Sequence, residues 1–191
     1  MKNKSATLFY LIGASGAGKD SVLHAMREMW PDKLMVAHRY ITRAAEAGGE
    51  NHVALSEKEF LQRQESGLFA MSWQANGYRY GVGAEIDLWL SQGRDVIVNG
   101  SRAYLDTAIE RYGDNLVPVV IDVEPAVLKQ RLYARGRESE REIIKRLDRA
   151  ELYRRLCPAN GIVVDNSGSL ENTMMQFSKA LSASLSTESS S

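Results

Sequence analysis

Short apolar runs alternate along this chain with longer segments in which apolar residues recur at helical spacing. The apolar runs at 6–12, 34–37, 95–98, 116–123 and 161–165 predict buried strands. The segments between and after them predict helices over 19–30, 101–112, 125–134, 138–156 and 170–181. Strands that alternate with helices are typical of a parallel sheet covered on both faces. The pattern therefore predicts an α/β fold with a five-stranded parallel sheet in three layers.

Residues 38–80 depart from this alternation. Glycine and polar residues cluster at 47–51, and Ser56 followed by Glu59 predicts the start of a helix through a capping box. The runs 68–73 and 78–82 predict two further short strands, and 84–91 a helix. We interpret this stretch as a small excursion from the main sheet.

Composition narrows the class of protein. The chain has 191 residues, of which 44% are apolar and 25% charged, so we expect one globular domain over 1–181. A net charge of zero argues against a nucleic-acid partner. A single cysteine, Cys157, makes no internal disulfide, and the apolar run at 8–12 is too short for a signal or a membrane span. We expect a cytoplasmic protein with no membrane partner and with a disordered serine-rich tail over 182–191.

A glycine-rich loop follows the first predicted strand. Gly13-Ala14-Ser15-Gly16-Ala17-Gly18-Lys19 has the spacing of a P-loop, two glycines five residues apart and then lysine. Glycines let backbone N–H groups turn toward phosphate oxygens, and the following helix directs its positive end to the same place. Lys19 adds a charge for the β- and γ-phosphates. The loop predicts a binding site for ATP.

The residue after Lys19 is unusual for such a loop. The position that ordinarily holds serine or threonine is Asp20, and Ser21 follows it. A carboxylate is also a hard oxygen ligand, so Asp20 is a candidate ligand for Mg²⁺, directly or through water. The alternative is that Asp20 only stabilises the helix N-terminus.

With this loop and the motifs named below, the chain resembles the guanylate kinase family, and within it the ribose 1,5-bisphosphate phosphokinases of phosphonate degradation. The resemblance covers about 8–166. Besides the loop, its anchors are the Ile41-Thr42-Arg43 element, the helix start at 56–60, the hairpin at 77–81 and the basic segment at 131–137. It implies a P-loop NTPase fold with a small acceptor-binding insertion over about 39–83 and a lid over about 135–141.

Departures from the guanylate kinase pattern indicate the acceptor. Where that family has a glutamate and a serine that read guanine, this chain has Met71 and Val82, which offer guanine no hydrogen bond. A second phosphate-gripping arginine is replaced near Glu46. The family's Asp-Ile-Asp becomes Asn-Gly-Ser at 99–101, followed by Arg102, so carboxylates are lost and a cation appears. This change favours a more anionic acceptor, such as a sugar bisphosphate.

The resemblance also implies roles for individual residues. Phosphoryl transfer spreads negative charge that fixed cations stabilise. The family's catalytic and lid arginines correspond to Arg131, Arg135 and Arg146, with Arg137 and Arg141 as weaker candidates. Acceptor binding is expected from Arg43, His52, Tyr80, Ser101 and Arg102, although His52 could equally lie in a surface loop. Asn166 and Ser167 are candidates for the adenine pocket.

The resemblance thus implies transfer of the γ-phosphoryl group of ATP to ribose 1,5-bisphosphate, with Mg²⁺, giving 5-phospho-α-D-ribose 1-diphosphate (PRPP) and ADP. Two alternatives stay open. One is a guanylate kinase, against which Met71 and Val82 argue. The other is a non-catalytic interaction module, against which Lys19 and the lid arginines argue. The sequence leaves the oligomeric state open.

Overall fold

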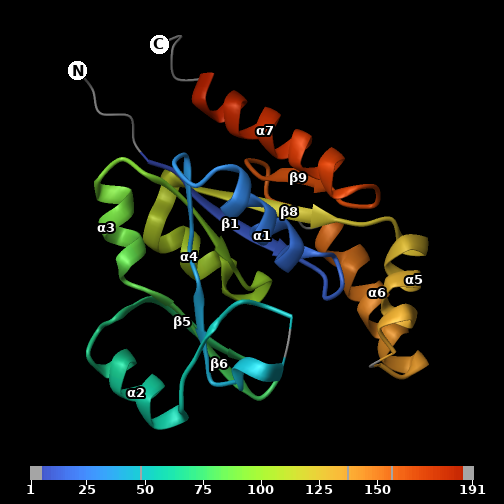
Figure 1. The fold of residues 1–191 in the computed structure, drawn as a ribbon, viewed down its shortest axis with the longest axis horizontal. Helices are drawn as coiled ribbons and strands as arrows, with labels where there is room; N and C mark the ends of the chain where they lie inside the picture. The colour runs from blue at the N-terminus through green and yellow to red at the C-terminus, as the bar shows by residue number, and fades with distance from the viewer. Residues whose placement is uncertain (1–5, 48, 137, 156, 187–191) are drawn as a thin grey trace. The chain divides into compact units, whose positions relative to one another are not determined.

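Two sheets form the framework of the protein. The structure, a computed structural model, describes residues 6–47, 49–136, 138–155 and 157–186. A five-stranded parallel sheet has the order β2-β7-β1-β8-β9, and a second sheet has the order β4-β3-β6-β5 (Figure 1). Their bounds are Leu8–Gly13 (β1), Leu34–Val36 (β2), Arg39–Ile41 (β3), Val53–Ala54 (β4), Phe69–Ala75 (β5), Tyr78–Gly83 (β6), Asp95–Asn99 (β7), Leu116–Asp122 (β8) and Ile162–Asp165 (β9). The predicted α/β fold with a five-stranded parallel sheet is confirmed.

Helices follow most of the strands. Their bounds in the described ranges are Lys19–Met29 (α1), Glu57–Glu65 (α2), Glu85–Ser91 (α3), Leu105–Tyr112 (α4), Pro125–Arg135 (α5), Glu140–Arg155 (α6) and Leu170–Ser186 (α7), with single 3₁₀ turns at Ala45–Ala47, Arg102–Tyr104 and Gly113–Asn115. Among the residues described, no helix is long and apolar enough to cross a membrane.

The chain divides into two compact units. The first comprises Met1–Tyr10 and Met26–Val117. In it β2 pairs in parallel with β7, α3 packs on β5 and β7, and α2 packs on β5. The complete second sheet, which runs from Arg39 to Gly83, also belongs to this unit.

A hairpin and two very short strands build the second sheet. β5 and β6 are antiparallel and join at Asn76-Gly77, both at positive φ (50° and 80°), which suits a tight hairpin turn. β3 pairs antiparallel with β6 and parallel with β4. The sequence predicted β5 and β6 but not β3 or β4. Those strands have three and two residues, too few to show a periodic pattern.

The second unit comprises Leu11–Ala25 and Pro118–Ser191. Its strands β8 and β9 pair in parallel, beginning with Val119 opposite Ile162. α7 lies along β9, and α5 packs against α6 (Figure 1). Val119, Val120 and Ile121 are at most 2% exposed, as expected for a strand that is covered on both faces.

Several helix ends differ from the prediction by one to five residues: α4, for example, begins at Leu105 rather than 101 because a 3₁₀ turn, Arg102–Tyr104, precedes it. α6 begins at Glu140 rather than 138 because Ser139 caps it: the Ser139 backbone N–H donates to the Glu142 carboxylate at 2.8 Å, and Glu142 N–H faces the Ser139 hydroxyl at 3.4 Å. α7 continues to Ser186, so 182–186 are helical rather than part of a disordered tail. Alanine and leucine among those serines favour the helix. The remaining tail residues, 187–191, lie outside the described residues.

Candidate active site

The loop between β1 and α1 has the backbone of a phosphate-binding loop. Gly16 and Gly18 lie at φ +87° and +88°, a region that other residues adopt only at a cost. Ala17 N–H donates to the Ala14 carbonyl at 3.1 Å, which closes a tight turn. α1 begins at Lys19, so its first N–H groups point toward the loop. These features together make an anion-binding concavity.

Close packing also requires glycine at three positions of this loop. A Cβ atom on Gly13 would lie 2.8 Å from the Ile121 carbonyl oxygen, and one on Gly16 would lie 2.9 Å from Leu132. A Cβ on Gly18 would lie 2.5 Å from Nδ2 of Asn166. The loop is therefore held closely against β8, α5 and the end of β9.

Lys19 lies back over the loop that precedes it. Its Nζ donates to the carbonyl oxygens of Gly13 at 2.7 Å and Ala14 at 3.0 Å. The side chain is half-buried, and these two bonds fix the ammonium group at the loop. A positive charge held there matches the phosphate-binding role predicted for Lys19.

Asn166 joins the loop to the rest of the unit. Its Nδ2 donates to the Ala17 carbonyl at 2.6 Å, and its Oδ1 accepts from the Thr173 hydroxyl at 2.7 Å. Asn166 is 6% exposed. The hydroxyl of Ser167, the other candidate for the adenine pocket, accepts from Glu124 N–H at 2.8 Å. Both side chains are thus engaged with the protein, and Asn166 supports the phosphate loop.

Two of the predicted arginines lie at this loop. Arg131 donates from Nη2 to the Asn166 carbonyl at 2.8 Å, and its Nη1 is 4.0 Å from the Cβ position of Gly18. Arg146, on α6, donates to the hydroxyl of Ser15, which is exposed on the loop. The structure therefore brings together Lys19, Arg131 and Arg146, which lie far apart in the sequence.

A carboxylate connects Arg146 with Arg135. Glu138 Oε1 lies 3.2 Å from Arg146 Nη2 and 3.9 Å from Arg135 Nη2, and the Glu138 side chain is only 5% exposed. Of the other predicted lid arginines, Arg141 is exposed on α6, and Arg137 lies outside the described residues.

Asp20 is exposed in the first turn of α1, next to Lys19. No cluster of three or more metal-ligating side chains occurs within the described ranges. Mg²⁺ at nucleotide sites is commonly held by one or two protein oxygens together with phosphates and water. The single carboxylate of Asp20, beside a loop built for phosphate, is compatible with that mode of binding.

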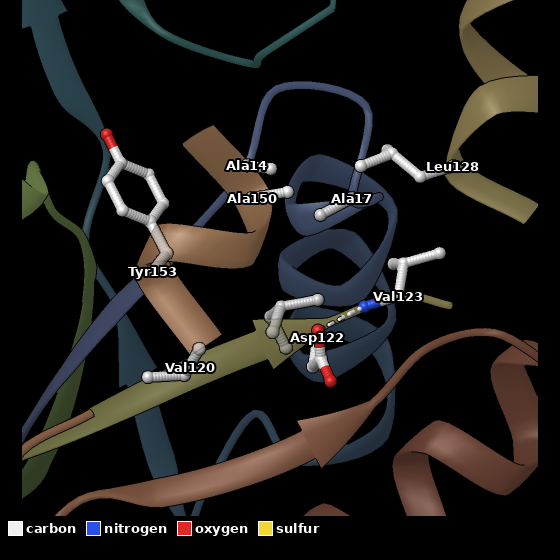
Figure 2. Close-up of a pocket in the computed structure, with 9 residues that line it drawn as sticks. Ala14, Ala17, Val120, Asp122, Val123, Leu128, Ala150 and Tyr153 are labelled. Atoms are coloured by element: carbon white, nitrogen blue, oxygen red, sulfur yellow. Dashed lines mark hydrogen bonds between the residues drawn. The ribbon is translucent and has the colours of Figure 1, made fainter. Parts of the chain in front are cut away.

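A small pocket lies beneath the phosphate loop in the second unit (Figure 2). Ala14 and Ala17 of the loop, Leu128 of α5 and residues 120–123 of β8 line it, with Ala150 and Tyr153 of α6. Asp122 accepts a hydrogen bond there from Val123 N–H at 2.9 Å. The pocket holds little more than a water molecule and is too small for a nucleotide. It is a packing space behind the loop rather than the binding site.

The first unit carries the residues predicted to bind the acceptor. Arg43 is half-buried, and its Nε is buried without a hydrogen-bond partner among the described residues. His52 is 8% exposed, with Nδ1 3.0 Å from the Glu50 carbonyl oxygen and Nε2 3.0 Å from that of Arg43. His52 therefore does not lie on an exposed surface loop, and it holds the backbone on both sides of the 44–49 connection. Its role in ligand binding stays a prediction.

Tyr80 belongs to an aromatic and cationic cluster. Its ring stacks on Trp73 with centroids 5.8 Å apart and planes inclined by 3°. The guanidinium of Arg39 lies 4.9 Å from the Tyr80 centroid and forms an ion pair with Glu50. Tyr104 also contacts Trp73, at 5.4 Å between centroids. Of the residues in this cluster, only Tyr80 was predicted from the sequence.

Tyr10 organises the segment that follows β7. Its hydroxyl donates to the Ser101 carbonyl at 3.0 Å and accepts from Ser101 N–H at 2.9 Å. A Cβ on Gly100 would lie 2.2 Å from the Tyr10 ring, so glycine is required there. Asn99 is 2% exposed, and its Oδ1 has no hydrogen-bond partner in the described part of the chain. Ser101 and Arg102 follow it, both half-buried.

Several residues of these sites were not predicted from the sequence, among them the charged residues Arg39 and Glu138 and the ion pair of Arg39 with Glu50. Arg39 and Glu50 are eleven residues apart, with no periodic pattern between them. Glu138 lies at the predicted start of a helix rich in charged residues, where one more carboxylate does not stand out. No local signal distinguishes such residues, because their partners are set by how the chain folds back.

Comparisons with known proteins agree with these features. The guanylate kinase family model matches residues 5–184. Three curated relatives carry the name ribose 1,5-bisphosphate phosphokinase PhnN. The protein from Pectobacterium parmentieri is 53% identical over 91% of this chain and 93% of its own length. That from Yersinia pestis is 52% identical over 92% and 91%, and that from Klebsiella pneumoniae is 54% identical over 91% and 91%.

A solved structure shows the same fold. The crystal structure of guanylate kinase from Anaplasma phagocytophilum superposes with a TM-score of 0.72 at 20% identity, covering 96% of this chain and 87% of that one. At that identity the likeness concerns the fold alone. The family model, however, spans nearly the whole sequence. This chain therefore belongs to the guanylate kinase family.

Proposed function

We propose that this protein is a ribose 1,5-bisphosphate phosphokinase. It transfers the γ-phosphoryl group of ATP to the C1 phosphate of ribose 1,5-bisphosphate and so forms 5-phospho-α-D-ribose 1-diphosphate and ADP in phosphonate catabolism in the cytoplasm. The observation that carries the proposal is the 52–54% identity to relatives of that name over about nine tenths of the chain.

The residues at the phosphate loop fit a nucleotide triphosphate. The positive φ angles of Gly16 and Gly18 turn the backbone so that N–H groups face the concavity, and Lys19 adds a fixed charge. Arg131 and Arg146 lie at the same loop. This combination of backbone donors and cations suits the phosphates of ATP.

The first unit fits a sugar phosphate better than guanine. Met71 and Val82 are opposite each other on β5 and β6 and are at most 1% exposed. Guanine N–H groups buried against them would lack partners, at a cost of about 1–3 kcal/mol each. The chain instead offers Arg43, Arg102 and Ser101 as donors for phosphate and hydroxyl oxygens. These residues are proposed to bind the acceptor, with Tyr80 and His52.

Catalysis follows from positioning and fixed charge. The nucleophile is a phosphate oxygen that is already anionic at neutral pH, so no general base is required. Arg146 and Arg131 stabilise the negative charge that develops on the transferred group. Arg135, which contacts the same Glu138 carboxylate as Arg146, is the third arginine proposed to contribute. Lys19 orients the β- and γ-phosphates. Mg²⁺, for which Asp20 is the proposed ligand, neutralises phosphate charge when bound.

One assay distinguishes this function from its alternatives. The protein is incubated with Mg-ATP and either ribose 1,5-bisphosphate or GMP, and ADP and the phosphorylated product are measured. We expect ADP and 5-phospho-α-D-ribose 1-diphosphate with the sugar, and little turnover of GMP. Preference for GMP would show a guanylate kinase, and no ADP with either acceptor would favour a non-catalytic interaction module.

A substitution tests the loop itself. Lys19→Ala should abolish turnover and leave the fold intact, because the half-buried side chain lies at the phosphate loop, where its Nζ donates to the Gly13 and Ala14 carbonyls. Lys33→Ala, an exposed lysine outside the site, is the matched control and should behave like the unmodified chain. Circular dichroism verifies folding of both variants. Retained activity in Lys19→Ala would refute the assignment of the loop.

A further inference from the structure

Arg39 and Glu50 form a largely buried ion pair in the first unit. Arg39 Nε donates to Glu50 Oε1 at 2.7 Å, and Nη2 contacts Oε2. The two side chains are only 14% and 11% exposed. Removing two charged groups from water costs free energy, so a buried ion pair often adds little to the net stability of a protein. A pair retained in this position therefore calls for a reason other than stability.

The guanidinium of Arg39 is held in a fixed orientation. Glu50 occupies the edge formed by Nε and Nη2, and the plane of the group lies over the rings of Tyr80 (4.9 Å) and Trp73 (6.0 Å). Nη1, which carries two N–H donors, makes no hydrogen bond to any residue in the described part of the chain. Its donors are thus oriented in advance and available to a ligand.

Among the described residues, the cross-strand row that contains Arg39 has no other charged side chain. Arg39 lies opposite Val82 on the neighbouring strand, and Val82 lies opposite Met71, so the rest of this cross-strand row is apolar. The Glu50 carboxylate offsets the charge of this guanidinium, so a phosphate would be bound through hydrogen bonds from the Nη1 donors rather than by a free positive charge. Above an apolar and aromatic surface little water competes for these donors.

Residues 50–52 contact the side chain of Arg39 and the backbone of a second arginine, Arg43. The Glu50 carboxylate binds the side chain of Arg39, and His52 Nε2 lies 3.0 Å from the carbonyl oxygen of Arg43. The buried Nε of Arg43 also lacks a partner among the described residues. One short segment thus holds the guanidinium of Arg39 and contacts the backbone of Arg43, and both arginines have a side-chain nitrogen without a hydrogen-bond partner among the described residues.

We propose that Arg39 binds the second phosphate of the acceptor, the one that does not react, and that Glu50 is its positioning residue. The inference rests on the proposed function, because an acceptor with two phosphates needs two cationic sites whereas a nucleoside monophosphate needs one. Arg43 then serves the reacting phosphate. The planar fork of Arg39 suits a phosphate, to which its remaining donors bind.

Two monophosphates, each with one of the two phosphates of the acceptor, allow binding at the two phosphate sites to be measured independently. Ribose 5-phosphate carries only the non-reacting phosphate, and ribose 1-phosphate only the reacting one. Each is measured as a competitive ligand against ribose 1,5-bisphosphate, in the unmodified chain and in Arg39→Gln. We expect the Ki of ribose 5-phosphate and the KM of the bisphosphate to rise about 10- to 100-fold in the variant, with kcat little changed. The Ki of ribose 1-phosphate should stay within about twofold.

A second variant keeps the test valid if Arg39→Gln unfolds through the unpaired Glu50 carboxylate. Arg39→Gln combined with Glu50→Gln removes both charges and leaves two amides that can pair. It should raise the Ki of ribose 5-phosphate alone. The matched control is Arg79→Gln, which breaks the ion pair of Arg79 with Glu57 (3.0 Å) in the same sheet and should change neither Ki.

The contrary outcomes are distinct. An equal rise in both Ki values would show that Arg39 has only a structural role, and an unchanged Ki for ribose 5-phosphate would overturn the proposal outright. Failure of the proposed function would appear earlier, in the unmodified chain, as no ADP formed with ribose 1,5-bisphosphate.

Discussion

The side-chain amide of Asn166 donates a hydrogen bond of 2.6 Å to the backbone carbonyl of Ala17 in the phosphate loop. The same amide accepts from Thr173 at 2.7 Å, and the backbone carbonyl of Asn166 accepts from Arg131 at 2.8 Å. One buried residue thus connects the loop, a predicted catalytic arginine and helix α7. The shape of the loop depends on a residue 149 positions away in the sequence.

Asn166→Asp should impair ATP binding. A carboxylate cannot donate to the Ala17 carbonyl and repels it instead, so a buried acceptor loses its partner at about 1–3 kcal/mol. We expect the KM for ATP to rise about tenfold or more. Asn172→Asp, a change of the same kind at an exposed position of α7, should leave the KM unchanged. Equal KM values for the two variants would contradict the supporting role of Asn166.

Gly18→Ala should be costly for two separate reasons. Its φ of +88° disfavours any side chain, and the new Cβ would lie 2.5 Å from Asn166 Nδ2. Gly67→Ala isolates the first reason, because Gly67 has φ +69° and open space around its Cβ position. Urea unfolding should show that the free energy of unfolding falls by about 1 kcal/mol in the control and by more in Gly18→Ala. Only Gly18→Ala should also raise the KM for ATP.

Arg146→Gln should lower kcat much more than it changes the KM for ATP. Removing a fixed donor that stabilises a transition state typically costs about 100- to 1,000-fold in kcat. Arg149→Gln, an exposed arginine on the same helix, is the control and should retain full activity. Ser15→Ala removes the hydroxyl that Arg146 contacts but keeps the guanidinium, so kcat should fall only slightly. A large fall of kcat in Arg149→Gln would show that the total positive charge of the helix matters rather than the position of Arg146.

Asp20→Asn tests the proposed magnesium ligand. If the carboxylate binds Mg²⁺, the variant should need a several-fold higher concentration of free Mg²⁺ for half-maximal activity. If Asp20 only stabilises the N-terminus of α1, the Mg²⁺ dependence stays the same and the free energy of unfolding falls by about 0.3–1 kcal/mol. Activity titrated with Mg²⁺ and thermal unfolding distinguish the two roles.

The sequence alone determined the elements and the phosphate loop of this protein. Strands such as β1, β7 and β8 are short apolar runs, and the spacing of Gly13, Gly18 and Lys19 is visible without a structure. Such features are local: a buried strand needs only apolar neighbours, and a tight anion-binding turn needs glycines at set positions. The resemblance carried by these motifs also indicated the family.

Only the tertiary structure decided which residues hold these parts together. Asn166 was a candidate for the adenine pocket, yet its amide supports Ala17. For His52 the exposed surface-loop alternative is wrong, because the side chain is buried with its ring nitrogens facing two backbone carbonyls. Its role as a ligand stays a prediction. The ion pair between Arg39 and Glu50 had no signal in the sequence. The physical reason is the same for each: a hydrogen bond or ion pair depends on distance in space, and the partners of these side chains come together only when the chain has folded.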